Sequence, residues 1–544
     1  MIAALPRQQT ARRARRGAPR RETLRLAVLA TLLVLAGGNA AAADSILRRG
    51  VFGEPESLAP RESGIAGEQL ILRDLFEGLT TFGPDARVVP GAAESWQASA
   101  DGRRYTFRLR AGLRWSDGAP LAAQDFVFGW RRALDPRTAA SRAQRLYAIR
   151  GAREVHAGRA APATLGVSAP DARTVVIELE YPLPWLPVLL AGEEGFPLPR
   201  HAIERYGEQW TRAGNMVSNG AFVVAERRAR GSILARRNPH FHAAREVRLD
   251  GVMFLPSDDT RGLANRFRSG DLDVNSWPGF PPAQQEALRR ELGGQVRVAP
   301  LGSVRFLRFN VRRAPFDDVR VRRALSLLVD RDVLVRRVLP RGERASVRPM
   351  PDGIPGDLRP AGLELERGTQ AQRVAAARAD LAAAGFRQRR SEPIRLRLPS
   401  GNGDEICIAV AAMWTAGGAP TRLEQSEIKS LIADLRRGDF DVALTGAQDS
   451  PAVESYLERF RRGASYNTGG YASAPFERAL DAALRLAEPE ARARELQRAE
   501  SILAADHTVV PLIEEVARNL VSRRVAGWVD NAQDIHLSRY LALQ

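Results

Sequence analysis

The chain has 544 residues, of which 44% are hydrophobic and 26% are charged, and its formal net charge at pH 7 is +18. This length exceeds what one hydrophobic core usually serves, so we expect two or three domains, and the ordinary composition excludes a fibrous or disordered chain. The basic residues are scattered, without a basic helix or a basic patch interleaved with aromatic residues, so nucleic acid is excluded as the expected partner.

The first 43 residues are predicted to be a cleavable signal peptide. Eight arginines precede or border the apolar run Leu26–Leu35, and Ala41–Ala43 satisfies the small-residue rule for signal peptidase. The apolar run is too short to span a bilayer, and no cysteine that could carry a lipid anchor lies near the cleavage site. We expect a soluble periplasmic protein, not lipid-anchored, that starts near Asp44. The general secretory route is preferred to a twin-arginine route through Arg20-Arg21.

The stretch Ala93–Pro136 combines the periodicities of a strand and a helix. Apolar side chains first alternate with polar ones, at Tyr105, Phe107 and Leu109. This pattern predicts a strand buried on one face, which Leu113–Trp115 is expected to resume after a turn. From Gln124 onward, apolar side chains recur at helical spacing, at Phe126, Val127, Trp130 and Leu134. By itself this stretch predicts a structural module in which an amphipathic helix ends at Asp135-Pro136.

The later sequence continues to alternate between strand and helix patterns. Hairpins are predicted at 167–180 and 222–236, and the prolines between 182 and 187 mark a predicted domain crossing. The segment Phe306–Asp330 predicts a strand, a turn and a helix. Further strands are predicted at Phe440–Gly446 and Thr508–Ile513.

Two long ordered strings carry a family resemblance. One is ESW…YTFRLRAGLRWSDG…AQDFVF…W…DP within Ala93–Pro136, and the other is FLRFNVRRAPFDDVRVRRALSLLVD at Phe306–Asp330. They resemble the extracellular solute-binding proteins of family 5, the peptide-binding components of ABC import systems, and the resemblance covers residues 46–540. Ala122 departs from the pattern, because the family commonly has a helix-capping threonine there.

The resemblance implies an α/β fold of the periplasmic-binding-protein type, with two lobes joined by a hinge and an extra subdomain. We expect domain I at 44–66, 191–300 and 516–544, domain II at 67–190, and domain III at 301–515. Such a protein binds oligopeptides between its lobes and delivers them to a membrane permease with ATPase subunits. It is implied to be a monomer, to need no cofactor and not to be an enzyme.

A carrier of peptides of varied sequence must recognise the features that all peptides share. The peptide backbone can be bound by strand addition, and the terminal ammonium needs a carboxylate. The resemblance assigns this role to Asp449, in a loop one residue shorter than in the family members that the chain most resembles. On the residues alone, Asp449 could instead cap the loop before Ser450-Pro451.

Further ligand-binding residues follow from the resemblance, namely Glu54, Pro55, Phe306, Arg308, Gly446, Ala447, Gln448 and Glu515. Asn275 is added because it lies at the C-terminal end of a predicted strand, where α/β sheets tend to place ligands. Several positions depart from the family pattern. Arg308 stands where peptide binders often have an acidic group facing the cleft, which favours acid-bearing peptides. Leu444 replaces a frequent arginine, and Glu514-Glu515 stands where tyrosines are common. Because these changes alter the charge of the cleft, ligand preference is not carried over from the family.

Other functions have less support in the sequence. His240 and His242 lack a third ligand at metal spacing, and the chain has neither a G-x-S-x-G elbow nor a Walker loop. We therefore expect no metal site, no hydrolytic triad and no ATP site. Within the binding class, murein peptides, dipeptides and a non-peptide solute stay open as ligands. A secreted enzyme and a chaperone-like protein are the alternatives from other classes.

Overall fold

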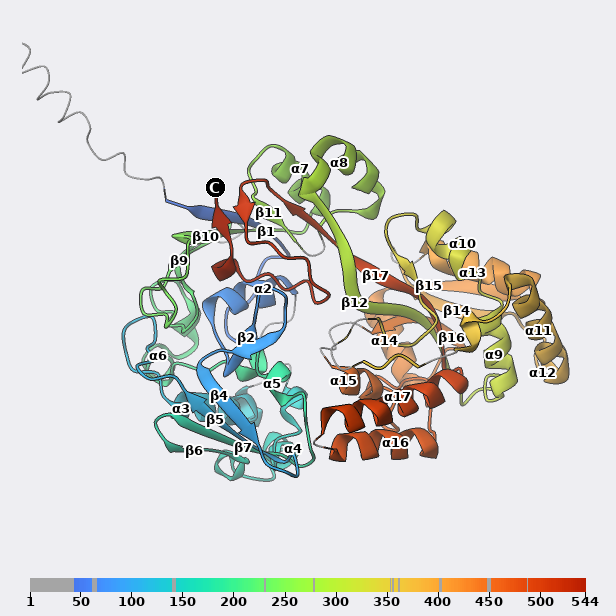
Figure 1. Ribbon diagram of the computed structural model, residues 1–544, viewed down its shortest axis with the longest axis horizontal. Coiled ribbons are helices and arrows are strands. Elements are labelled where there is room, and N and C mark those ends of the chain that lie inside the picture. The colour runs from blue at the N-terminus through green and yellow to red at the C-terminus, as the bar shows by residue number, and fades with distance from the viewer. Residues whose placement is uncertain are drawn as a thin grey trace, which may run out of the picture. The chain divides into compact units, whose positions relative to one another are not determined.

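One large mixed sheet runs through most of the chain (Figure 1). The computed structural model describes residues 44–544 except 61–65, 139–142, 229–230, 277–278, 353, 355–356, 361–362, 401–403, 448–451 and 487. Within these residues the sheet has eleven strands, ten of them in the order β15-β14-β16-β12-β17-β11-β1-β10-β9-β8, with β13 paired to β17.

The strands of this sheet come from distant parts of the sequence. At one end lie β1 (Ile46–Phe52), β8 (Phe222–Arg228), β9 (Ser232–Arg237), β10 (Gly251–Ser257) and β11 (Val274–Asn275). At the other end lie β14 (Ile394–Pro399), β15 (Thr421–Ser426) and β16 (Val442–Ala447). The middle is formed by β12 (Val296–Phe309) and β17 (Val509–Val521), and β13 is Arg344–Ala345.

The antiparallel pair β12 and β17 connects the two ends of the sheet (Figure 1). β17 also pairs with β11, and β12 also pairs with β16. The register of the pair shifts between Pro300 and Val304. Residues 301–303 therefore leave the regular ladder, and this interruption borders the cavity described below.

A separate four-stranded antiparallel sheet lies between β1 and β8 in the sequence. Its order is β4 (Ala93–Ala98), β5 (Arg104–Leu109), β7 (Thr174–Glu178) and β6 (Val167–Asp171). Tyr105, Phe107 and Leu109 are buried, as the alternating pattern predicted. The predicted helix is α3 (Ala123–Ala133), and its apolar stripe is buried in the same core.

The predicted strand at Leu113–Trp115 is wrong. Only the single bridge Arg114–Pro120 forms there. The amide of Gly118 donates to the carbonyl of Trp115 at 2.9 Å, and that of Trp115 donates to Ala119 at 2.8 Å. The segment therefore closes on itself in a tight turn, which Gly118 permits with φ +86°.

The helices fill the remaining layers. Their bounds up to β12 are α2 (Ala66–Leu75), α3, α4 (Ala152–His156), α5 (Leu186–Leu189), α6 (Arg200–Tyr206), α7 (Thr260–Arg268) and α8 (Gln285–Leu292). After β12 they are α9 (Val319–Leu327), α10 (Arg331–Val333), α11 (Gln370–Ala383), α12 (Phe386–Arg389), α13 (Asp404–Ala416), α14 (Ile428–Arg437), α15 (Val453–Glu458), α16 (Ala474–Arg485) and α17 (Pro489–Ala505). No helix among the described residues combines the length and apolar character that a membrane span requires.

Alternate residues of β12 pack into different cores. Leu307 and Phe309 join a core with α9, α11 and α13, whereas Val304 and Phe306 join one with α15, α16 and α17. Side chains of successive strand residues point to opposite faces, so the two helix groups cover opposite faces of this end of the sheet. The helix expected within 306–330 is confirmed, since Val321, Leu325, Leu328 and Val329 are buried.

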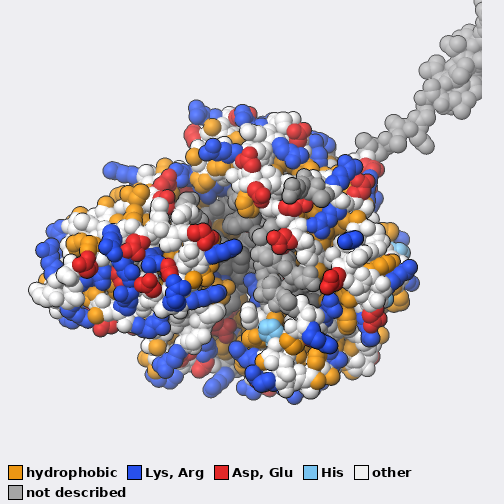
Figure 2. All heavy atoms as spheres, turned by 180° about the vertical axis from the view of Figure 1, so that it is seen from behind, with side chains coloured by type: hydrophobic (Ala, Val, Ile, Leu, Met, Phe, Trp, Pro, Cys, Tyr) orange, Lys and Arg blue, Asp and Glu red, His pale blue; other side chains and the backbone are white. Residues whose placement is uncertain are grey.

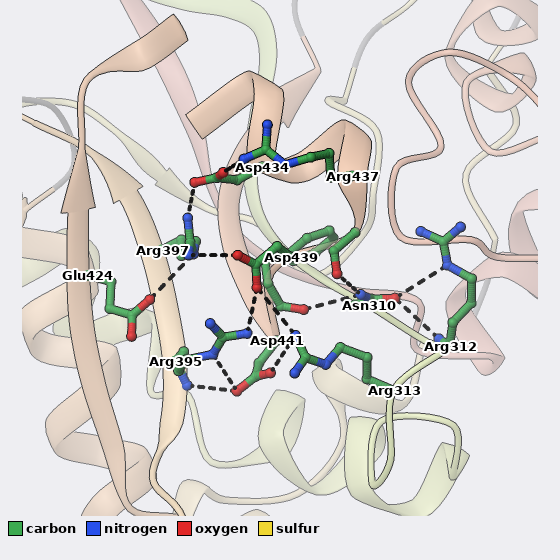
Figure 3. Close-up of polar contacts among 12 residues, drawn as sticks. Asn310, Arg312, Arg313, Arg395, Arg397, Glu424, Asp434, Arg437, Asp439 and Asp441 are labelled. Carbon is green, nitrogen blue, oxygen red and sulfur yellow. Dashed lines mark hydrogen bonds and ion pairs between the residues drawn. The ribbon is translucent and has the colours of Figure 1, made fainter. Parts of the chain in front are cut away.

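An ionic network occupies the end of the sheet (Figure 3). Leu396 and Leu398 of β14 are buried, while the alternating Arg395 and Arg397 are surrounded by carboxylates. The Arg397 guanidinium lies 3.4 Å from Glu424 and 3.5 Å from Asp439, and it also contacts Asp434. Because these carboxylates are already paired with arginines, we assign the network a structural role. On the face seen in Figure 2, basic and acidic side chains are likewise intermixed.

Candidate ligand-binding site

A cavity of about 460 Å³ lies between two groups of segments. One wall comes from α2, α5, the residues just after α5 and the C-terminal stretch 532–537. The second wall comes from 301–303, Asp352, Ile354, the end of α15 and Tyr466. This volume lies within the range typical of small-molecule sites, roughly 300–1,000 Å³.

The first wall combines apolar and aromatic side chains with polar and charged ones. Its apolar and aromatic side chains are Leu70, Phe82, Trp185, Val188, Leu189, Ile535 and Leu537. Trp185 is the N-cap residue of the short helix α5, whose early position is occupied by a proline. Proline has a fixed φ that suits the first turn of a helix, so the proline-rich segment that predicted a domain crossing also positions Trp185. The indole Nε1 of Trp185 has no hydrogen-bond partner among the described residues.

A buried arginine forms the base of the cavity. Arg49 of β1 is 1% exposed and donates to the carbonyl of His536 and the hydroxyl of Ser538, both at 2.8 Å. Burial lowers the pKa of Arg49, and the Asp74 carboxylate 3.8 Å away opposes that shift. Arg49 therefore holds the C-terminal stretch against the first strand, which makes its main role structural.

The second wall is supported from behind by Glu514 and Glu515 of β17. The hydroxyl of Ser303 donates to Glu515 at 2.6 Å, and Nε of Arg305 donates to it at 2.7 Å. Glu514 accepts a 2.9 Å hydrogen bond from the amide of Asp352. Ser303 and Asp352 line the cavity, so Glu515, an expected ligand residue, contacts a wall residue rather than lining the cavity itself.

The other expected ligand residues do not all meet at this cavity. Asn275 is fully buried and donates to the carbonyl of Gly279 at 2.6 Å, while its neighbour Ser276 lines the cavity. The carbonyl of Pro55 accepts a hydrogen bond from Arg227, and Glu54 is partly exposed. Among the described residues that line the cavity, neither Glu54 nor Pro55 is found.

Phe306 and Arg308 lie on the face of the sheet that packs against α15–α17. Phe306 is buried in that core. The guanidinium of Arg308 lies 5.4 Å from the Phe306 ring centre and 5.5 Å from that of Phe460, and it forms no ion pair with a described residue. Burial, and then the nearby charge of Arg459, lower the pKa of Arg308 to about 10.

The remaining expected residues lie at the end of β16. Gly446 and Ala447 pair in register with Arg305 and Val304, beside the interrupted part of β12. Asp449 and Gln448, the next expected residues, lie outside the described part of the chain.

Several cavity residues had only a weak signal in the sequence. Glu458 ends a helix of only six residues, and Arg459 and Tyr466 follow it; this helix is too short for a hydrophobic period to stand out. The Arg459 guanidinium lies 4.8 Å from the ring centre of Tyr466 and 5.6 Å from that of Tyr456. A charged residue flanked by two tyrosines within eleven positions was the available signal, and it is a weak one.

Comparison with known proteins is consistent with this architecture. Residues 87–468 match the bacterial extracellular solute-binding proteins, family 5 Middle. The chain is 34% identical to the probable deoxycholate-binding periplasmic protein YgiS of Escherichia coli, over 92% of this chain and 94% of that protein. It is 33% identical to the periplasmic oligopeptide-binding protein OppA of Haemophilus influenzae, over 89% and 91%.

Solved structures agree on the fold. The unliganded open form of the periplasmic murein tripeptide-binding protein MppA, a protein of Escherichia coli, has a TM-score of 0.82 at 32% identity, over 92% of this chain and 98% of that one. OppA of Haemophilus influenzae in complex with the peptide RPPGFSPFR has a TM-score of 0.74 at 32% identity, over 92% and 99%. The predicted α/β fold of the periplasmic-binding-protein type is confirmed, and the domain limits stay a prediction. Because the family model matches most of this chain and solved structures of relatives share its fold, the chain belongs to the extracellular solute-binding proteins of family 5.

Proposed function

We propose that this protein binds oligopeptides in the cavity and delivers them to an ABC importer. The observation that carries the proposal is the cavity of about 460 Å³, in which apolar and aromatic side chains of the first wall lie together with polar and charged groups of both walls. Peptides present apolar side chains beside regularly spaced polar backbone groups, so both walls find matching chemistry. Relatives named as oligopeptide-binding proteins support this ligand class.

Asp449 is our candidate for the contact with the peptide's terminal ammonium. It follows β16 by two residues, and the end of β16 lies beside the interrupted part of β12 that borders the cavity. A carboxylate there would supply the charged acceptor that an ammonium needs once water is excluded. Closure of the two walls over the ligand, by bending of the β12–β17 connection, would exclude that water.

The proposed setting is the periplasm, reached by means of the signal peptide at 1–43. The proposed partners are a membrane permease and its ATPase subunits, which supply the ATP hydrolysis, and the protein acts as a monomer that does not transform its ligand. The periplasmic location named for several relatives supports this setting.

A second candidate ligand is a murein peptide or an amphipathic non-peptide solute. Two relatives are named for murein peptide and for deoxycholate. The wall formed by Trp185, Leu189 and Ile535 offers an apolar surface of the kind that the hydrocarbon face of a bile acid needs.

Thermal unfolding of the purified mature protein tests these ligands against one another. We expect a peptide mixture to stabilise the protein, by about 2.7 kcal/mol at a hundredfold excess over Kd, and the peptide to be recovered intact. Native mass spectrometry would identify any ligand that co-purifies. If deoxycholate or a murein tripeptide raises the melting temperature and the peptide mixture does not, the oligopeptide proposal is wrong.

A further inference from the structure

Glu458 has no ion-pair partner in the described part of the chain, whereas other charged groups of the cavity wall do. Several of these are paired: Glu194 lies 2.9 Å from Arg145, Asp352 lies 3.0 Å from Arg348, and Asp534 lies 3.0 Å from His536. Glu458, the last residue of α15, also lines the cavity. Its carboxylate has neither an ion pair nor a hydrogen bond with any residue in the described part of the chain.

The cations closest in sequence are directed elsewhere. Arg461 lies 3.1 Å from Glu477 and 2.6 Å from Asp481. Arg459 stacks on Tyr456 and Tyr466. The cavity wall therefore contains a carboxylate that no described side chain neutralises.

The surroundings of Glu458 disfavour its negative charge. Burial raises the pKa of Glu458 to about 7; the Arg461 charge opposes this shift, and the Glu454 charge adds to it. Glu454 is itself paired with Arg492 at 3.2 Å. The pKa of Tyr181, in the segment after β7, is raised to about 12 by burial and then by the charge of Glu458. A ligand cation would relieve a charge that the protein leaves uncompensated.

We propose that the Glu458 carboxylate binds a cationic group of the ligand, a primary ammonium or a guanidinium, and thereby selects peptides that carry a basic side chain. The aromatic rings of Trp185 and Tyr466 line the same cavity, and aromatic faces also attract cations. This inference rests on the proposed function, since it specifies which peptides the cavity prefers.

Ligand binding at this subsite is coupled to the release of a proton from Glu458. A ligand cation stabilises the ionised carboxylate, so binding near pH 7 displaces a proton from the fraction of Glu458 that carries one. As the pH falls below about 7, more Glu458 is protonated and the preference for basic peptides weakens. At pH 8 the carboxylate is already ionised, and binding displaces almost no proton.

The test compares alanine tripeptides and pentapeptides that carry one lysine, at each position in turn, with the same peptides carrying norleucine. Norleucine keeps most of the apolar stem and removes the ammonium. We expect wild-type protein at pH 8 to prefer the best lysine peptide over its norleucine counterpart by about 10- to 100-fold in Kd, because a charge-assisted contact is lost. Glu458→Gln should abolish that preference, while the exposed Glu490→Gln on α17 should keep it.

Calorimetry at pH 7 in phosphate and in Tris provides a second measurement. For wild-type protein, the apparent binding enthalpy of the lysine peptide should differ between the two buffers, by an amount that corresponds to release of about half a proton per peptide bound. For Glu458→Gln, the enthalpy should be the same in both buffers. Glu458→Gln should also unfold at a higher temperature than wild type at pH 8, since it removes a disfavoured charge, and this shows that it folds.

Three outcomes would overturn the inference. If Glu458→Gln still prefers lysine over norleucine, the cation binds elsewhere. If the variant instead abolishes the effect of N-acetylating the peptide, Glu458 holds the terminal ammonium and the selection of basic side chains is wrong. If wild type binds both peptide series equally, this inference alone fails, whereas the proposed function fails with it only if wild type binds no peptide.

Discussion

Asp449 is the residue on which the proposed peptide site depends most. If the walls close over the peptide, its ammonium loses water and needs a charged partner. Asp449→Ala should then weaken binding by about 2–5 kcal/mol, which is roughly thirtyfold to several-thousandfold in Kd. If Asp449 is instead an exposed loop residue, the loss should be about 1 kcal/mol or less. Isothermal titration calorimetry distinguishes the two, and thermal unfolding should show little change.

N-acetylation of the peptide is the matched control, because it removes the ammonium and keeps the backbone. Acetylation and Asp449→Ala should each weaken peptide binding strongly, and the two together should weaken it little more than either one alone. If Asp449→Ala binds free and acetylated peptides as tightly as wild type does, the amine site lies elsewhere and Glu54 is the next candidate.

Substitution of Arg308 tests whether this residue belongs to the ligand site or to the core. It stacks on Phe306 and Phe460, and burial lowers its pKa to about 10. Arg308→Met should leave peptide affinity unchanged and should keep or raise the free energy of unfolding, by up to about 2 kcal/mol, because an unpaired charge leaves the interior. This gain in the free energy of unfolding should shrink above about pH 10, where Arg308 of the folded wild type releases its proton.

Urea unfolding at pH 7 and pH 10.5 would measure this effect, with the exposed Arg289→Met as the control for loss of one positive charge. A loss of affinity confined to acid-bearing peptides would place Arg308 in the ligand site, as its position in the family pattern led us to expect.

How far the site could be predicted differs from residue to residue. The segment around Asn275 and the end of β16 were expected near the ligand, and their neighbours Ser276 and 301–303 do line the cavity. Trp185, Glu458 and Tyr466 could not be predicted, because they meet only after segments almost 300 positions apart have packed. Such proximity depends on tertiary structure and leaves no local period in the sequence.

At the scale of single elements, the N-terminus of α3 is incompletely capped. Ala122 has the extended conformation of an N-cap residue but no side-chain acceptor, and only the Asp125 carboxylate compensates by accepting from the Ala122 amide at 2.9 Å. Ala122→Thr should stabilise the protein by up to about 1 kcal/mol, since a hydroxyl would accept from a free amide of the first turn. Urea unfolding would measure the change.

Ala122→Val is the matched control, because valine has the shape of threonine without the hydroxyl. If valine stabilises as much as threonine does, the gain comes from packing and the capping explanation is wrong.

Helices and strands with a clear period of apolar residues were predictable from the sequence. A turn with the apolar character of a strand was not. β5, α3 and α9 appeared where the sequence placed them because each buries one side or stripe of its residues. Leu113–Trp115 has the same apolar character, yet its backbone bonds to Gly118, Ala119 and Leu121 rather than to a neighbouring strand. The turn involves only a few residues, so the period of apolar residues in the sequence could not distinguish it from a strand.

At the scale of the whole molecule, the proposed signal peptide at 1–43 makes a testable prediction. The intact mass of protein recovered from the periplasm should correspond to the loss of about 43 residues. Ala43→Phe should block cleavage, because signal peptidase needs a small residue there, and Ala42→Phe at the tolerant middle position should not. A retained leader in the wild-type protein, or equal cleavage of both variants, would contradict the assigned site.

The position of Arg49 has a consequence for the order in which the chain can fold. Its guanidinium bonds to Ser538, 489 residues later, and Ser538 also donates to Asp74 across 464 residues. Within the described part of the chain, β1 pairs only with strands made more than 200 residues after it, at β10 and β11. The buried arginine of β1 thus lacks two of its hydrogen-bond acceptors until residues 536–538 have been made. Until residues 536–538 have been made, the contacts around Arg49 cannot all form, and this part of the nascent chain stays accessible to a chaperone.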